Sequence, residues 1–174
     1  MARIMFYNII RFIALITVQV VLFKNIGYYN LATFFPYILI ILLLPLGTSN
    51  FFVYLLAFAT GLAIDAFYDS MGIHTAACVA LAWFRIVFIR ITLEMDVRQS
   101  SDSPSWGGLG SKWYISYVFF GTLIHHLTLF VIEVFSFQNF LMTSLSILLS
   151  SLSTFAIILL ISLLFYKRKS RLGI

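Results

Sequence analysis

The residues best suited to chemistry in this sequence are two aspartates and a histidine in the segment GLAIDAFYDSMGIH, residues 61–74. Asp65 lies in an otherwise apolar stretch, where an ionisable side chain is costly in a membrane and therefore marks a functional or buried structural contact. Asp69 lies one helical turn later and shares a helix face with it, and His74 follows a tight turn through Gly72. We expect a polar cluster near the outer membrane surface that serves as a binding or contact site. The alternative is that Asp65 hydrogen-bonds neighbouring backbone while Asp69 and His74 are hydrated.

Two further histidines, His125 and His126, are adjacent in another apolar stretch. Adjacent helical positions point about 100° apart, so at most one of them faces a pocket, and a hydrogen bond to another helix is the favoured role. One of them with Glu133, Asp65 and Asp69 would make a set of ligands for a divalent metal, but the spacing is not diagnostic. Metalloprotease, serine-hydrolase and phosphate-loop motifs are absent from the sequence. We therefore predict no catalytic residues, no metal site, no cofactor and no enzyme activity.

Small residues recur at helical spacing beside this segment. Ala57 and Gly61 form one small-xxx-small pair, and Ala76 and Ala80 form a second in the next apolar stretch. Such pairs let two membrane helices approach closely, so we expect a compact hairpin. A stripe of small hydroxyl residues, Ser146, Ser150 and Ser153 with Thr154, lies on the last stretch. Helix packing is the favoured role for this stripe, and the lining of a substrate path is the alternative.

The composition places these residues in a membrane protein. Of the 174 residues 62% are hydrophobic and 10% charged, and the single cysteine, Cys78, excludes an internal disulfide framework. Continuous apolar runs without strict alternation predict helices rather than barrel strands. We predict one all-α membrane domain over residues 1–174, a bundle of about six transmembrane helices at residues 4–23, 31–46, 51–68, 73–91, 113–134 and 140–166. Pro36 and Pro45 make the second span short.

The basic residues predict how the chain is oriented. The net charge is +5, yet the Lys and Arg residues lie at span ends, so topology explains them and nucleic-acid binding is not expected. With six spans, Lys24 alone is outside, and both termini and the basic C-terminal tail, residues 167–174, are cytoplasmic. The loop over residues 92–112 is polar and rich in Ser and Gly, which is typical of a flexible connection. The alternative is a docking surface for a cytoplasmic partner, anchored through Trp106.

The length, the six spans and the segment Gly61-Leu62-Ala63-Ile64-Asp65, followed by Gly72 and His74, resemble the rod shape-determining protein MreD family. That family has a glycine, an aspartate four residues later, a Gly-x-His-like turn into the next span and a basic C-terminal end. The resemblance covers the whole chain in layout. The family pattern places a partner-binding or structural motif at Gly61, Asp65, Gly72 and His74, to which the residues add Asp69.

The resemblance implies a non-enzymatic scaffold of the bacterial elongation machinery in the cytoplasmic membrane. It implies that the protein binds MreC and acts with MreB, RodA and a penicillin-binding synthase in rod shape and peptidoglycan synthesis. It also implies a fold similar to the substrate-binding S components of energy-coupling factor transporters. An S component that takes up a vitamin or metal is the alternative function, although the few polar residues near Asp65 are a thin set for a hydrophilic ligand.

Overall fold

The computed structural model describes residues 2–24, 32–134 and 140–164, and all regular elements among them are helices. The predicted all-α bundle is therefore confirmed. The elements are α1 (Ala2–Val18) with a π-helical continuation η1 (Gln19–Phe23), a 3₁₀ turn η2 (Pro36–Ile38), α2 (Leu39–Leu42), α3 (Asn50–Tyr68), α4 (Ile73–Thr92), α5 (Met95–Arg98), α6 (Trp106–Leu109), α7 (Ser111–Val134) and α8 (Phe140–Leu164). The start of the second predicted span and the basic tail lie outside the described residues.

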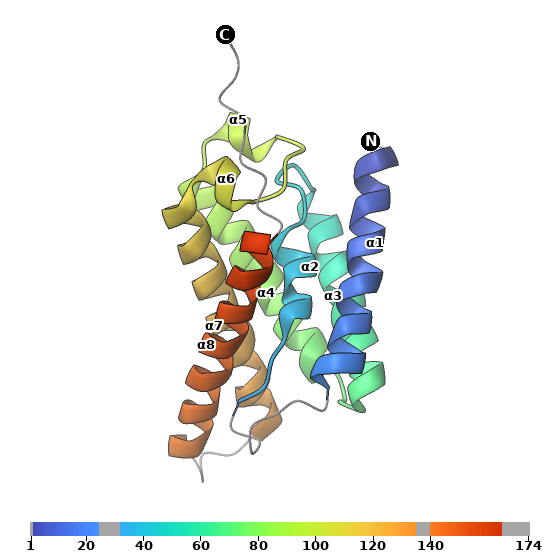
Figure 1. The fold of residues 1–174 in the computed structure, drawn as a ribbon, viewed down its shortest axis with the longest axis vertical. Coiled ribbons are helices and arrows are strands. Elements are labelled where there is room, and N and C mark those ends of the chain that lie inside the picture. Colours follow the sequence, from blue (N-terminus) through green and yellow to red (C-terminus); the bar gives the residue numbers. More distant parts are fainter. Residues whose placement is uncertain (1, 25–31, 135–139, 165–174) are drawn as a thin grey trace.

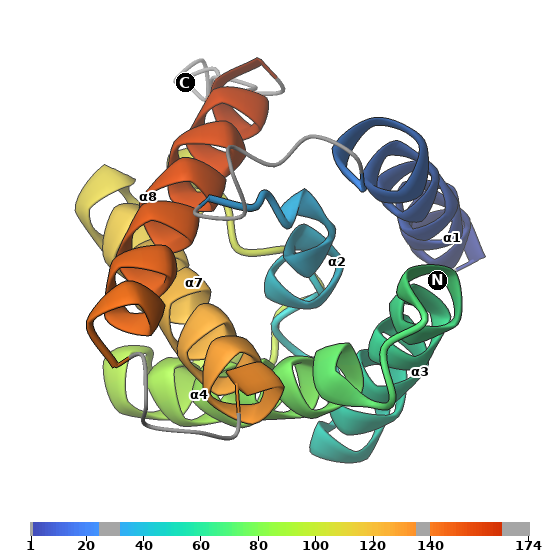
Figure 2. The same cartoon turned by 90° about the horizontal axis from the view of Figure 1, so that it is seen from below.

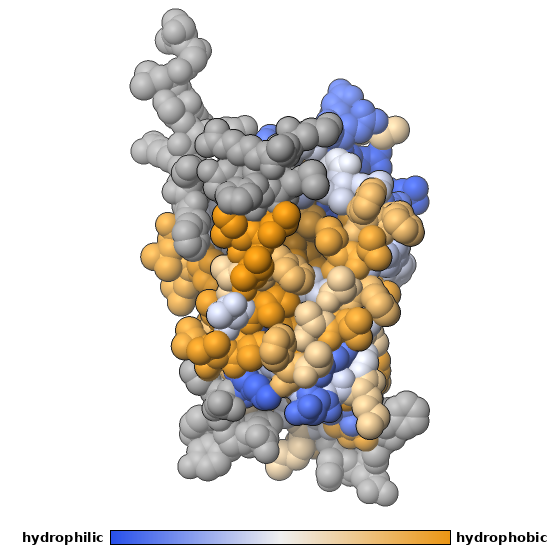
Figure 3. Space-filling view, turned by 90° about the vertical axis from the view of Figure 1, so that its right-hand side faces the viewer, coloured by the Kyte–Doolittle hydropathy of each residue, from blue (hydrophilic) through white to orange (hydrophobic). Residues whose placement is uncertain are grey.

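Four of these helices, α3, α4, α7 and α8 from residue 141 onward, are long and apolar enough to cross a membrane. A shorter apolar helix covers Ile9–Phe23. Large hydrophobic side chains are exposed along them, for example Phe51 on α3 and Leu141 on α8. One face of the molecule carries a broad apolar belt between two polar ends (Figure 3). Exposed apolar surface of this extent needs lipid around it, so the chain is a multi-pass membrane protein.

The long helices surround a short one. Helices α3, α4, α7 and α8 pack in chain order into a curved wall, α1 lies beside α3 at one edge of this wall, and the wall and α1 surround α2 (Figures 1 and 2). The start of α1 and the last turn of α8 lie at the same end of the bundle as α5 and α6, which we call the α5–α6 end (Figure 1). The opposite end carries the turn between α3 and α4, and we call it the turn end.

The second predicted span is not one continuous helix. Its described part is irregular over residues 32–35, forms a 3₁₀ turn at Pro36 and only four residues of α-helix, and turns again before Pro45. The two prolines explain the breaks, because proline has no N–H to donate and constrains the residue before it. The segment is nevertheless the centre of the core, since Tyr37, Ile41 and Leu42 are fully buried.

Hydroxyl groups of α8 accept hydrogen bonds from the irregular backbone of this segment. Ser150 Oγ accepts from the N–H of Thr33 at 3.0 Å, and Thr154 Oγ1 accepts from the N–H of Phe35 at 3.1 Å. Backbone without helical hydrogen bonds is tolerated at membrane depth only where protein groups replace them. The hydroxyl stripe of α8 therefore holds the broken segment rather than only closing a helix contact.

The carbonyl groups that end α2 are satisfied in the same way at the α5–α6 end. The carbonyls of residues 42–45 accept hydrogen bonds of 2.8–3.0 Å from the hydroxyl of Tyr117 and the guanidinium groups of Arg11 and Arg85. Cationic donors suit this position, because the C-terminal end of a helix carries partial negative charge and unpaired carbonyls. Three long helices thus fix the short one.

The connection between α4 and α7, predicted as a flexible loop, folds into α5 and α6 and is bound to the core segment. The N–H groups of Leu46 and Gly47 donate to the carbonyls of Asp102 and Ser100 at 2.9 and 2.8 Å. Trp106 packs against the core from α6. Composition alone did not predict this attachment, because the residues that hydrogen-bond to each other are more than fifty positions apart in the sequence.

Candidate functional site

Gly61 lies at the closest approach of α3 and α4. A Cβ at this position would lie 2.7 Å from the backbone nitrogen of Thr75 and 2.8 Å from the carbonyl oxygen of His74. Both atoms belong to the backbone of α4, so no side chain can move away to make room. Ala57, one turn earlier, is fully buried. The predicted close contact of these two helices is therefore present and has Gly61 at its tightest point.

The other small residues that we expected in helix packing are buried to different degrees. Ala76 and Ala80 are half-buried, and the fully buried small residue of that stretch of α4 is Ala77. On α8, Ser146 and Ser150 are buried and Ser153 is half-buried. The small-residue pattern thus identifies the packed helices, while the fully buried alanine of this stretch, Ala77, is next to Ala76 rather than a member of the suggested pair.

The carboxylate of Asp65 caps the following helix. Its Oδ1 accepts from the N–H of His74 at 3.0 Å and from Ser70 Oγ at 2.6 Å. Its Oδ2 accepts from the N–H of Thr75 at 2.9 Å and from Thr75 Oγ1 at 2.6 Å. His74 and Thr75 are the second and third residues of α4, the positions whose N–H groups an N-cap side chain normally satisfies. Here the N-cap residue is Gly72, which has no side chain, so an aspartate from the preceding helix takes this role.

The turn between α3 and α4 depends on two left-handed residues. Asp69 ends α3 with φ of 53°, and Gly72 precedes α4 with φ of 84°. Because Asp69 has left the helix, it does not extend the face of Asp65. Its side chain is exposed and forms no hydrogen bond or ion pair within the described residues. The structure therefore brings together Gly61, Asp65 and His74, and leaves Asp69 on the surface.

Replacing Gly72 by alanine is expected to destabilise the protein by about 1 kcal/mol, because an L-residue is strained in the left-handed region. A Cβ at this position meets no atom within 4 Å, so conformation alone causes the loss. Thermal unfolding of the purified protein in detergent measures it. The opposite exchange, Asp69→Gly, relieves strain at φ of 53° and is the control. Equal losses in both variants would contradict this account of the turn.

A buried chain of polar side chains extends inward from the cap. The hydroxyl of Tyr37 lies 3.0 Å from Nδ1 of His74 and 2.8 Å from Nε2 of His125, and all three residues are buried. Polar side chains in a membrane domain are stabilised by such contacts between elements. Sequence reasoning missed Tyr37, although its position directly after Pro36 in an apolar stretch was a signal. It also missed Gln19, which is fully buried and donates to the Phe34 carbonyl at 3.0 Å.

The two adjacent histidines point to different partners, as their angular separation predicts. His125 reaches Tyr37, whereas His126 Nδ1 lies 2.8 Å from the carbonyl of Thr122 and its Nε2 lies 3.1 Å from Thr154 Oγ1. Because a carbonyl only accepts, Nδ1 of His126 carries the proton and Nε2 accepts from Thr154. Both histidines join helices, which is the role that we favoured for them.

A pocket of about 370 Å³ opens at the turn end, beside His74, the first member of this buried group of polar side chains. It is lined by Thr33, Phe35, Tyr68, Ser70, Ile73, His74, Leu129, Phe130 and Glu133. His74 is its buried polar residue, and Glu133 is exposed. Within the part of the chain that the structure describes, no three His, Cys, Asp or Glu side chains come together as a metal ion requires. The pocket therefore presents one imidazole, several hydroxyl groups, one carboxylate and aromatic walls.

Fold and site together define a multi-pass helical membrane protein with a broken central segment and an aspartate-capped helix hairpin. Comparisons with protein-family models, with curated proteins and with solved structures found no match for this chain.

Proposed function

We propose that this protein is a non-enzymatic scaffold of the bacterial cell-elongation machinery, located in the cytoplasmic membrane with both termini in the cytoplasm. The observation that carries the proposal is the cap. Gly61, Asp65, Gly72 and His74 are the residues on which the resemblance to the MreD family depends, and they form one structural unit in which both oxygens of Asp65 are used inside the protein. A motif that fixes two helices rather than presenting a reactive group suits a scaffold.

The distribution of positive charge supports the orientation. Arg85, Arg90, Arg98 and Lys112 lie towards the α5–α6 end, whereas Lys24 lies at the turn end beside Phe67. Cytoplasmic loops of membrane proteins carry an excess of Lys and Arg. The α5–α6 end then faces the cytoplasm, and the turn end faces the outer compartment.

The proposed partner is the single transmembrane helix of MreC, which packs against an exposed apolar helix face, and through it the protein acts with MreB, RodA and a penicillin-binding synthase. Apolar surface gives no driving force between helices that are already in lipid, so the contact relies on packing and a few hydrogen bonds. Lipids cover the remaining apolar belt.

Depletion of the protein in its native cell tests this function. Cells are expected to become round, and tagged protein is expected to retain MreC during purification in mild detergent. A growth defect that added nutrients rescue, with cell shape unchanged, would contradict the scaffold function.

A second candidate function is the capture of a small molecule, as in an S component. The turn-end pocket of about 370 Å³ favours it, since ligand sites are concave and combine aromatic walls with a few polar groups. The broken central segment favours it too, because transporters bind substrates beside discontinuous helices. Thermal unfolding in the presence of vitamins or divalent ions tests this candidate, because a specific ligand raises the unfolding temperature.

A further inference from the structure

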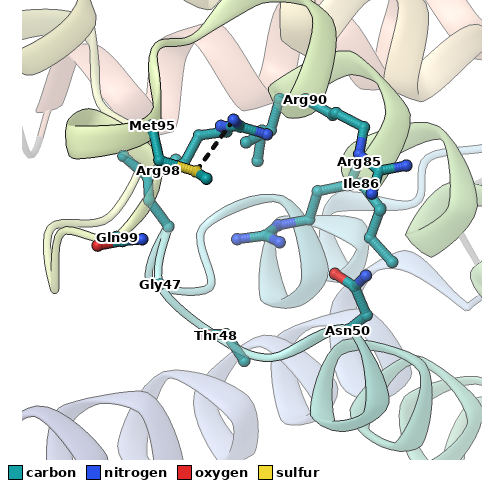
Figure 4. Close-up of a pocket in the computed structure, with 11 residues that line it drawn as sticks. Gly47, Thr48, Asn50, Arg85, Ile86, Arg90, Met95, Arg98 and Gln99 are labelled. Atoms are coloured by element: carbon teal, nitrogen blue, oxygen red, sulfur yellow. Dashed lines mark hydrogen bonds between the residues drawn. The ribbon is translucent and has the colours of Figure 1, made fainter.

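A second pocket of about 370 Å³ lies at the α5–α6 end and is strongly basic. Four segments surround it, namely the start of α3, the last two turns of α4, the short helix α5, and residues 46–48 (Figure 4). Three of its lining residues are Arg85, Arg90 and Arg98, and no aspartate or glutamate lines it. Its other polar lining residues, which include Asn50, are uncharged. A concave surface with three cations and no anion attracts negatively charged groups.

Arg85 is the buried member of this group. Its side chain is only 2% exposed, and one of its nitrogens donates to the carbonyls of Leu44 and Pro45 at 2.8 and 3.0 Å. Its Nε is buried without a hydrogen-bond partner, and no described carboxylate forms an ion pair with it. In Figure 4 its guanidinium extends into the middle of the ring of lining residues. A buried cation whose partners are neutral oxygens is costly, and an anion beside it offsets part of that cost.

Arg98 has unused hydrogen-bonding capacity on the opposite side of the pocket. One of its nitrogens contacts the sulfur of Met95 at 3.3 Å (Figure 4), and thioether sulfur is a weak acceptor. Its Nε is also buried without a partner. Arg90 is exposed at the rim. Two of the three arginines thus have buried N–H groups that nothing in the described chain accepts.

The N-terminal end of α3 adds a third source of positive potential. This helix of 19 residues begins at Asn50, which lines the pocket, and the side chain of its N-cap Ser49 forms no capping hydrogen bond. Uncapped N–H groups at the start of a long helix carry partial positive charge and favour anions.

We propose that this pocket binds a phosphate group. Guanidinium groups match phosphate oxygens with paired hydrogen bonds. The three arginines together can balance more negative charge than a single carboxylate carries, which favours a phosphate group as the ligand. The pocket lies at the last turns of α4, a helix long enough to cross a membrane, and lipid phosphates surround the ends of such helices. Its ligand is either the phosphodiester of an anionic lipid headgroup or a soluble phosphate from the adjacent aqueous compartment.

Binding of two probes to the purified full-length protein separates these sources. A short-chain phosphatidylglycerol and inorganic phosphate are titrated separately in detergent by calorimetry. Binding of phosphatidylglycerol alone assigns the site to a lipid headgroup, and binding of both shows that the phosphate oxyanion is sufficient. If neither probe binds, the proposal is wrong.

Charge-neutralising variants then locate the site. Arg90→Gln and Arg98→Gln are each expected to weaken binding about tenfold, the effect of losing one charge-assisted contact. Neither residue bonds the carbonyls that Arg85 holds, so both variants are expected to fold, and their elution in size-exclusion chromatography checks this. Lys112→Gln is the matched control, since Lys112 is an exposed cation at the start of α7 and does not line the pocket. An equal loss of affinity in Lys112→Gln would show non-specific charge attraction and overturn the proposal.

Discussion

Gly61→Ala is expected to destabilise the protein severely, because the added methyl group would overlap the backbone of Thr75 and His74. An extra methyl group in a packed core usually lowers the free energy of unfolding by about 1–3 kcal/mol when the side chains around it can rearrange. Here the obstructing atoms are backbone, so α3 and α4 must separate. Separation also lengthens the hydrogen bonds from α4 to Asp65, one turn along α3. We therefore expect the free energy of unfolding to fall by more than this range. Thermal unfolding in detergent and the monodisperse yield of a fluorescent fusion measure the loss.

Gly121→Ala is the matched control, with the same change in another buried helical glycine. A Cβ at Gly121 would meet the ends of the Leu42 and Leu81 side chains at 3.1 and 3.3 Å and an edge of the Phe84 ring at 3.3 Å. Side-chain ends can shift by a few tenths of an ångström, and alanine favours helix by about 1 kcal/mol over glycine. Gly121→Ala is therefore expected to be nearly neutral. Equal losses in the two variants would mean that the contact at Gly61 is not special.

The long helices were predictable because hydropathy measures the property that lipid selects. The span predicted over residues 51–68 is α3 at Asn50–Tyr68, and that over 73–91 is α4 at Ile73–Thr92. Hydropathy did not reveal the break in the second predicted span, because an apolar stretch has the same composition whether or not it forms a continuous helix. The signal for the break was local, namely the two prolines, but their effect depended on partners elsewhere.

Those partners are what the sequence does not reveal. Ser150 and Thr154 bond to a segment about 120 residues away, and only the folded bundle brings them together. The stripe they belong to was visible as a pattern, and its role in supporting non-helical backbone was not. For Asp65 the sequence left open a functional contact or a bond to neighbouring backbone, and the structure shows the bond to backbone. The only signal for the buried Tyr37 was its position after Pro36, and the walls of the turn-end pocket come from segments that only folding brings together.

Asp65→Leu is expected to prevent normal folding. The substitution removes the acceptor of two backbone N–H groups, those of His74 and Thr75, and of two hydroxyl groups. The hydroxyls can turn to other acceptors, but the N–H groups are fixed by α4. Each buried donor left unpaired costs about 1–3 kcal/mol, so the expected loss is about 2–6 kcal/mol. Folded yield and the thermal unfolding midpoint in detergent measure it.

Asp65→Asn separates a cap from a contact with a partner or ligand. Its amide oxygen can still accept from His74 N–H and Ser70, and its NH₂ group can donate to the Thr75 hydroxyl, so one donor, the N–H of Thr75, loses its acceptor. The expected loss is about 1–3 kcal/mol, smaller than that of the leucine variant. If the carboxylate instead served a partner through its charge, both variants would fold with wild-type stability and lose co-purification of MreC equally. A graded loss of stability, leucine greater than asparagine, is the outcome that the geometry requires, because the number of unpaired donors falls in that order.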